Sequence, residues 1–174
     1  MYIKRILEGE TNLFSFFLGR YSRPVHSLII RIIPAREDAE ELTQDTFLKA
    51  FRKLDSFKGD CSFSTWLYRI AYNTAVSATR KKKRVFPAFE DAGLDQIPDE
   101  AVDLLLEKED DENRLQLLEA AIDRLNPEDK TLITLFYMEE KSISEVASVL
   151  QLTTDNVKVK LYRVRKKLFV MINS

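Results

Sequence analysis

Apolar residues recur every three or four positions along most of the chain, which is the spacing of an amphipathic α-helix. No segment shows the sustained alternation of apolar and polar residues that is typical of a half-buried strand. Pro24 suits a helix start and Pro34 a helix stop. The pattern predicts an all-α fold with helices over residues 13–21, 24–33, 38–54, 63–82, 115–125, 127–138, 143–150 and 155–171.

Several of these helices have a start signal in the sequence. Asn126 precedes a proline and two acids, a typical N-terminal cap. Ser142 and Glu145 have the spacing of a capping box, and Thr153 or Thr154 can cap the last helix. The last two helices, joined by a three-residue turn, therefore predict a helix-turn-helix.

Charge and composition divide the chain into three parts. Residues 1–84 hold 16 basic and 9 acidic side chains, residues 85–113 hold 1 and 11, and residues 114–174 hold 10 and 8. The net charges are +7, −10 and +2. The middle part also contains Pro87, Gly93 and Pro98 and few core-forming residues. We expect two small helical domains, 1–84 and 114–174, joined by an acidic flexible linker, 85–113, with each basic domain suited to a polyanion.

Composition argues against several function classes. The 174 residues are 45% apolar, enough for a globular core, and no apolar run approaches the roughly 18 residues of a membrane span. A single cysteine, Cys61, favours the cytoplasm. The only histidine, His26, has no neighbouring ligand residues, and the four glycines are isolated. We therefore expect no membrane insertion, no metal, no cofactor and no enzymatic activity.

The last predicted helix has two contrasting faces. Its apolar stripe, which predicts the buried side, consists of Val157, Leu161, Val164 and Leu168. Its other side, flanked by Lys158 and Lys160, carries Val159, Tyr162, Arg163 and Lys166. Because apolar groups can approach base edges while cations reach phosphates or guanine, this face predicts a DNA-binding helix. A solvated basic face on an ordinary helix is the alternative.

A second candidate site follows Ser62. Its residues are Trp66, Asn73, Ser77 and Arg80, with Arg69 beside them, and the line runs into the basic segment 80–84. An aromatic ring, an amide and cations along one line suit single-stranded nucleic acid. Alternatively, Trp66 belongs to the edge of the core, and the basic residues complement the helix dipole.

The helix over 38–54 predicts a protein-docking face. Its core side is formed by Ala39, Thr43, Phe47, Ala50 and Leu54. Its other side carries Glu41, Gln44, Asp45, Leu48 and Arg52. An apolar anchor within a polar rim is typical of protein interfaces.

Two long stretches together resemble a known family. They are DAEELTQDTFLKAFRKLDSFKGDCSFSTWLYRIAYNTAVSATRKKKR and AIDRLNPEDKTLITLFYMEEKSISEVASVLQLTTDNVKVKLYRVRKKL. Their combination and order resemble the extracytoplasmic-function (ECF) sigma factors, the smallest members of the sigma-70 family of bacterial transcription initiation subunits. They cover somewhat over half of the chain.

The resemblance implies a role for each part. Residues 1–84 correspond to sigma region 2 and residues 114–174 to region 4. The implied partners are promoter DNA, an anti-sigma factor, and core RNA polymerase through its β′ clamp and β flap. The polymerase-binding set is Glu41, Gln44, Asp45, Leu48 and Arg52. The −10 element set is Phe63, Trp66, Arg69, Asn73, Ser77, Arg80, Lys81 and Lys82. The −35 element set is Thr154, Lys158, Val159, Tyr162, Arg163 and Lys166, with lysine at 158 and 160 where the family often has arginine.

Two other functions fit parts of the sequence. A stand-alone helix-turn-helix regulator explains the second domain. It leaves the docking face of 38–54 and the row of residues that begins at Trp66 without a role. A helical adaptor explains that face but not the basic C-terminal helix.

Overall fold

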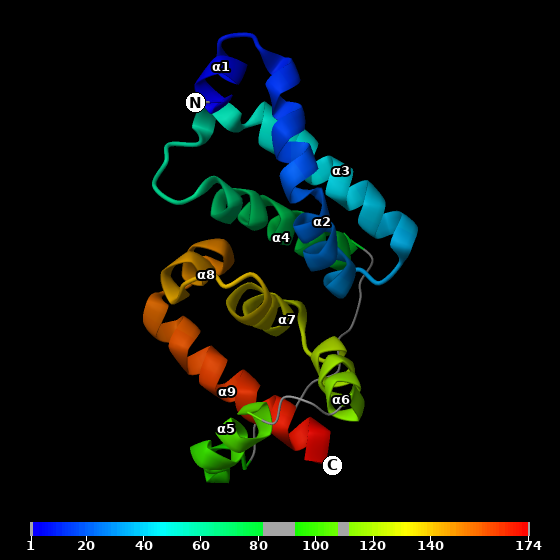
Figure 1. The fold of residues 1–174 in the computed structure, drawn as a ribbon, viewed down its shortest axis with the longest axis vertical. Helices are drawn as coiled ribbons and strands as arrows, with labels where there is room; N and C mark the ends of the chain where they lie inside the picture. The colour runs from blue at the N-terminus through cyan, green and yellow to red at the C-terminus, as the bar shows by residue number, and fades with distance from the viewer. Residues whose placement is uncertain (1, 82–92, 108–111, 174) are drawn as a thin grey trace. The chain divides into compact units, whose positions relative to one another are not determined.

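The computed structural model describes residues 2–81, 93–107 and 112–173 of the chain. Every regular element within these ranges is helical, which confirms the all-α fold (Figure 1). Packing divides the chain into two compact units, residues 1–84 with 144–152 and residues 85–143 with 153–174. The boundaries predicted for the domains and the linker stay a prediction. Lys82 of the −10 set lies outside the described residues.

Three long helices that pack on one another form the centre of the first unit: α2 (Phe14–Ile32), α3 (Arg36–Arg52) and α4 (Phe63–Lys81). The smaller elements are α1 (Tyr2–Leu7), η1 (Thr11–Leu13), η2 (Leu54–Ser56) and α8 (Ile143–Leu150). Leu28, Ile29 and Leu67 are among the fully buried core residues. Burial of each such side chain stabilises the fold by about 1.5–3 kcal/mol.

The helix α2 corrects one prediction. The sequence indicated two helices with a start at Pro24, but Pro24 lies inside a single continuous helix. A proline there removes one backbone donor and costs about 3 kcal/mol in a helix interior. Burial of Phe17 before the proline and of Val25 and Leu28 after it offsets that cost, because one continuous helix keeps all three in the core. The helix ends at Ile32, ahead of Pro34, as predicted.

The second unit surrounds the long C-terminal helix α9 (Thr154–Asn173), which contacts η3 (Leu94–Gln96), α5 (Asp99–Glu107), α6 (Glu112–Asp123) and α7 (Pro127–Ile133). The predicted cap of α7 is confirmed, because the Asn126 side-chain oxygen accepts a hydrogen bond of 2.8 Å from the Asp129 backbone N–H. Thr153 caps α9 by accepting one of 3.1 Å from the Asn156 N–H. A five-residue π-helical segment, η4 (Thr134–Met138), continues α7.

Two elements form inside the stretch for which the sequence predicted a flexible linker. These are η3 and α5, and both contact α9. Each contributes a buried apolar residue, Leu94 in η3 and Val102 in α5, which are 3% and 4% exposed. Asp99 and Glu100 stand in the first turn of α5, where they complement the positive end of the helix dipole. The acidic composition of residues 85–113 did not indicate that Leu94 and Val102 are core positions.

Candidate nucleic-acid interface

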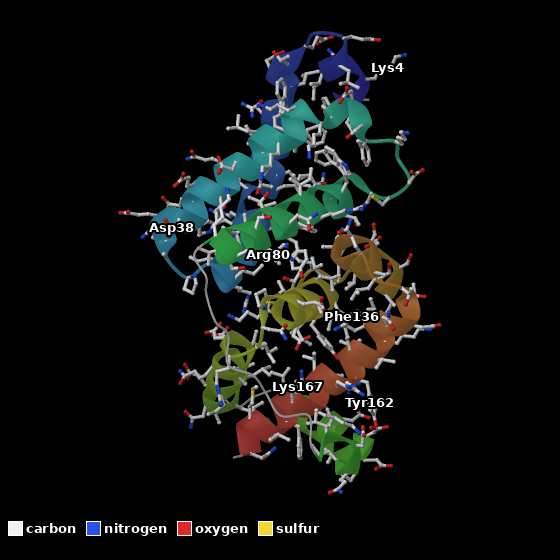
Figure 2. The ribbon with its side chains drawn as sticks, turned by 180° about the vertical axis from the view of Figure 1, so that it is seen from behind. Lys4, Asp38, Arg80, Phe136, Tyr162 and Lys167 are labelled. Carbon is white, nitrogen blue, oxygen red and sulfur yellow. The ribbon has the colours of Figure 1, made fainter. Side chains whose placement is uncertain are left out.

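The helix α4 presents a polar edge along its second half. Asn73, Ser77, Arg80 and Lys81 are exposed, and Arg69 is half-buried. Arg80 and Lys81 occupy the last turn of the helix, near which Figure 2 labels Arg80. Their positive charge complements the negative end of the helix dipole and leaves the cations able to contact phosphates.

An aromatic cluster forms around the start of α4. Trp66 and Phe63, both half-buried, have ring centroids 5.7 Å apart. Phe57, in the loop before α4, lies 5.3 Å from Trp66 and 5.8 Å from Phe63. Phe17 of α2 supports the cluster, with its ring 4.2 Å from that of Phe63. The resemblance already implied a role at the −10 element for the loop from Phe57 to Ser64, but nothing in the sequence assigned a role to Phe17, because only the tertiary packing brings its ring to Phe63.

Capping holds this cluster in place. The Ser62 hydroxyl accepts a hydrogen bond of 3.2 Å from the Thr65 backbone N–H at the start of α4. The Thr65 side chain is buried and is joined to the same hydroxyl at 2.8 Å. The helix therefore begins at a fixed position, one turn before Trp66.

The helix α3 has the two faces that the sequence predicted. Ala39, Phe47 and Ala50 are buried and Thr43 is half-buried, while Leu54 in η2 is also buried. On the other face, Asp45 is half-buried and the exposed side chains are Glu41, Gln44, Leu48 and Arg52. The Leu48 side chain is 51% exposed, and the polar residues Gln44 and Arg52 lie one helical turn before and after it. Such an anchor within a polar rim suits a protein partner.

On α9, one face is buried and the other is open. Val157, Val164 and Leu168 are buried, as predicted, and Leu161 is half-buried. Five of the six residues in the −35 set are exposed: Thr154, Lys158, Val159, Tyr162 and Arg163. Figure 2 labels Tyr162 on this helix, and its side chain is 42% exposed.

Lys166 is the exception, and its predicted outward orientation is wrong. The residue is only 2% exposed. Its ammonium donates a hydrogen bond to the Tyr162 hydroxyl, lies 4.0 Å from the centroid of that ring and stands 3.6 Å from a carboxylate oxygen of Asp99. The hydrogen bond to Tyr162 and the nearby Asp99 raise the pKa of Lys166 above its ordinary value. Helical periodicity could not reveal this burial because Asp99 belongs to α5.

The neighbouring cations also have acidic partners. Lys160 pairs with Glu128 at 2.5 Å, and Arg165 pairs with Asp103 of α5. The half-buried Lys167 lies 3.3 Å from the buried Asp129, and desolvation raises the pKa of the Asp129 carboxyl. Of the basic side chains at 158–167, the exposed ones are Lys158 and Arg163. The cationic part of the face predicted to bind DNA is therefore narrower than the sequence suggested.

Within the described residues, no group of three or more potential metal ligands comes together, and no helix is long and apolar enough to cross a membrane. His26 is half-buried and its Nε2 atom has no hydrogen-bond partner. Cys61 is half-buried and forms no disulfide. His26 lines a pocket together with Thr43 and Gln44 of α3.

Comparison with known proteins decides the family. The Sigma-70 region 2 model matches residues 17–85, and the Sigma-70 region 4 model matches residues 115–168. The ECF RNA polymerase sigma-E factors of Escherichia coli K12 and Salmonella typhimurium LT2 are each 31% identical over 170 residues, which span 94% of this chain and 88% of theirs. The chain belongs to the ECF sigma factors of the sigma-70 family. Sigma factors of this family are DNA-recognition subunits of RNA polymerase, so the comparisons support this function and not that of a stand-alone regulator.

Solved structures share the fold of this ECF sigma factor. CnrH, solved in complex with the cytosolic domain of CnrY, has a TM-score of 0.70 at 21% identity, with 99% of this chain and 95% of CnrH covered. The sigma factor RpoE of Bartonella quintana, solved with the anti-sigma factor NepR, has a TM-score of 0.68 at 23% identity, with 92% and 96% covered. The faces of α3 and α4 fall within the region 2 match and that of α9 within the region 4 match, whereas α5 lies between the two.

Proposed function

We propose that three separate helix faces of this sigma factor divide the work of promoter recognition. The face of α3 binds the β′ clamp of core RNA polymerase, the α4 face binds the opened −10 element, and the α9 face binds the −35 element as duplex. The observation that carries the proposal is the exposure of polar side chains on each face, opposite a buried apolar side.

The α4 face suits an unpaired strand. The cluster of Trp66 with Phe57 and Phe63 offers ring surface for a base, and Asn73 offers an amide that can pair with a base edge. Arg80 and Lys81 continue this face with charges for phosphates. Stacking on such rings is tolerant of base identity, so the amide supplies the selectivity.

The free energies of duplex opening and base capture explain why the α4 face needs the polymerase. Opening about ten base pairs forfeits roughly 14 kcal/mol at a mean stacking energy of about 1.4 kcal/mol per step. One or two captured bases return only about 1–3 kcal/mol each. The α3 face therefore has to bring the chain to core polymerase, whose own contacts supply the remaining free energy. Leu48 is the apolar anchor of that contact.

The α9 face suits the major groove. Val159 and Tyr162 are exposed between Lys158 and Arg163, so apolar surface and cations face the same direction. Arginine can bind guanine in a bidentate manner or contact a phosphate, and lysine acts as a point charge. Lys166 is left out of this contact set because it is buried.

Further expectations accompany this function. We propose that the chain has no enzymatic activity of its own, that it acts in the cytoplasm where it meets RNA polymerase, and that the β flap also contacts it. We also propose that an anti-sigma factor binds it, and the Bartonella RpoE structure supports this by analogy of fold.

Reconstitution with core RNA polymerase tests the proposal. Genomic fragments from the source organism are transcribed by core polymerase with and without the purified chain. We expect discrete run-off products that start at defined promoters and require the chain. A pattern of transcripts unchanged by its addition would contradict the proposal.

A further inference from the structure

Lys166 connects the acidic helix α5 to the exposed face of α9. Its ammonium lies between the Asp99 carboxylate, 3.6 Å away, and the Tyr162 side chain, to whose hydroxyl it donates a hydrogen bond. It also lies 4.0 Å from the centre of the Tyr162 ring. Asp99, Tyr162 and Lys166 line one pocket, together with Val102, Asp103 and Arg165.

Lys166 is buried, unlike the neighbouring residues of α9 that can contact DNA. It is 2% exposed, while Tyr162, one helical turn away, is 42% exposed. The ammonium already has an anion and an aromatic ring as partners, so contacting a phosphate would require it to leave both. The second pair between the helices, Arg165 with Asp103, holds α5 at the same place.

The hydrogen bond also determines what the Tyr162 hydroxyl offers. A lysine ammonium has three donors and no acceptor, so the hydroxyl oxygen must accept. The hydroxyl hydrogen then points away from Lys166 and is available to a hydrogen-bond acceptor outside the protein. In a DNA duplex the acceptors are the major-groove N7, O6 and O4 atoms and the phosphate oxygens.

We propose that Lys166 is a positioning residue, anchored by Asp99, that orients Tyr162 on the α9 face so that its hydroxyl donates to an acceptor of the DNA duplex. This rests on the proposed function of α9 in duplex binding. Neither family model covers α5, so the anchor comes from the segment between the two matched regions.

The test uses the full chain bound to core polymerase. The probe is the duplex that this complex enriches from a random-sequence library. Its affinity is measured over a range of salt concentrations for wild type, Lys166→Met, Tyr162→Phe, the double variant and Arg163→Ala. Arg124→Ala, an exposed arginine of the same unit outside the proposed face, is the matched control.

Arg163→Ala tests the proposed function alone. It should weaken binding and reduce the salt slope by about 0.9 if a phosphate contact is lost. Arg124→Ala should leave both unchanged. If Arg163→Ala behaves like Arg124→Ala, the α9 face is misassigned, whatever the Lys166 variants show.

The Lys166 variants test the positioning role. We expect Lys166→Met to weaken binding about fivefold with an unchanged salt slope, and to have no further effect in the Tyr162→Phe background. Lys166→Gln, which keeps a donor without the charge, should restore most of the affinity. Tyr162→Phe should remove a base preference at one position if the acceptor is a base edge, or weaken all sequences equally if it is a phosphate oxygen.

Three results would overturn the proposal. A salt slope reduced by Lys166→Met as it is by Arg163→Ala would make Lys166 a phosphate contact. Additive effects of Lys166→Met and Tyr162→Phe on affinity would show that the two residues act independently. Unchanged affinity and base preference in Tyr162→Phe, whose exposed site tolerates the substitution, would remove the hydroxyl from the interface. Thermal unfolding of each variant shows whether it is folded, so that a change in DNA binding is not mistaken for loss of fold.

Discussion

The Trp66 ring lies against the Phe57 ring, with centroids 5.3 Å apart and an interplanar angle of 49°. This contact joins the loop before α4 to the first turns of that helix. Phe63 packs on both rings. The rings therefore hold one another before any nucleic acid binds, which lowers the entropy lost when a base stacks on them.

Removing Phe57 should disturb Trp66 directly. Trp66 is the only tryptophan in the chain, so its fluorescence reports on this cluster alone. We expect Phe57→Ala to shift the emission to longer wavelength, as the indole becomes more exposed to water, and to reduce promoter opening several-fold in the reconstituted complex. Phe136→Ala, an aromatic deletion in the other unit, is the control. An unchanged spectrum would show that Phe57 does not support Trp66.

Asn73 should act in opening and not in polymerase binding. It is exposed on α4 and lies off the α3 face. Asn73→Ala should lower the fraction of open complex about tenfold, because one bidentate base contact contributes roughly 1–3 kcal/mol. Permanganate reactivity of unpaired thymines measures opening, and core polymerase binding is measured on the same samples. Asn12→Ala on η1 is the control, and equal opening in both variants would exclude Asn73 from base capture.

Leu48 offers a test of the docking face with a closely matched control. Leu48 on α3 and Leu7 on α1 are 51% and 52% exposed in the same unit. We expect Leu48→Glu to lose core polymerase binding by at least tenfold, since it places a charge at the centre of an apolar contact. Leu7→Glu should bind normally. Equal affinities of the two variants would place the polymerase contact elsewhere on the chain.

Much of this architecture follows from local sequence. The bounds of α8 match the prediction, and Asn126 and Thr153 cap their helices because a capping side chain acts on backbone groups within three residues. Continuation of α2 through Pro24 depended instead on burial supplied by helices that are distant in sequence.

The candidate sites show the same limit. Exposure on α3 and on most of α9 followed from helical periodicity. The burial of Lys166 could not be predicted in this way, because its partner Asp99 lies 67 positions earlier in the chain. The composition of that segment predicted a flexible linker. Phe17 likewise became part of the aromatic cluster only through the packing of α2 against Phe63.

Asp129 should make the second unit's stability depend on pH. Burial raises the pKa of its carboxyl above the ordinary value of 3.8, and Lys167 offsets only part of this. The folded state therefore binds the proton more tightly than the unfolded state does. This contribution to stability is fully present below pH 3.8 and is lost as the pH rises through the folded pKa.

The free energy of unfolding of wild type, measured by chemical denaturation relative to Asp129→Asn, should thus fall as the pH rises from 3.8 through the folded pKa. Asp123→Asn, at an exposed position at the end of α6, controls for the general loss of a carboxylate. A difference that grows with pH would show that the Lys167 pair outweighs burial, and a constant difference would show that the two effects cancel; either would contradict the prediction.

Site-specific photo-crosslinking tests the division of labour between the two DNA-binding faces most directly. A photo-reactive residue replaces either Ser77 on α4 or Lys158 on α9, and the reconstituted polymerase complex is irradiated on one of its own promoters. We predict that position 77 crosslinks to the −10 element of one strand and position 158 to the −35 duplex. Crosslinks from both positions to the same promoter element, or from neither to DNA, would contradict the account.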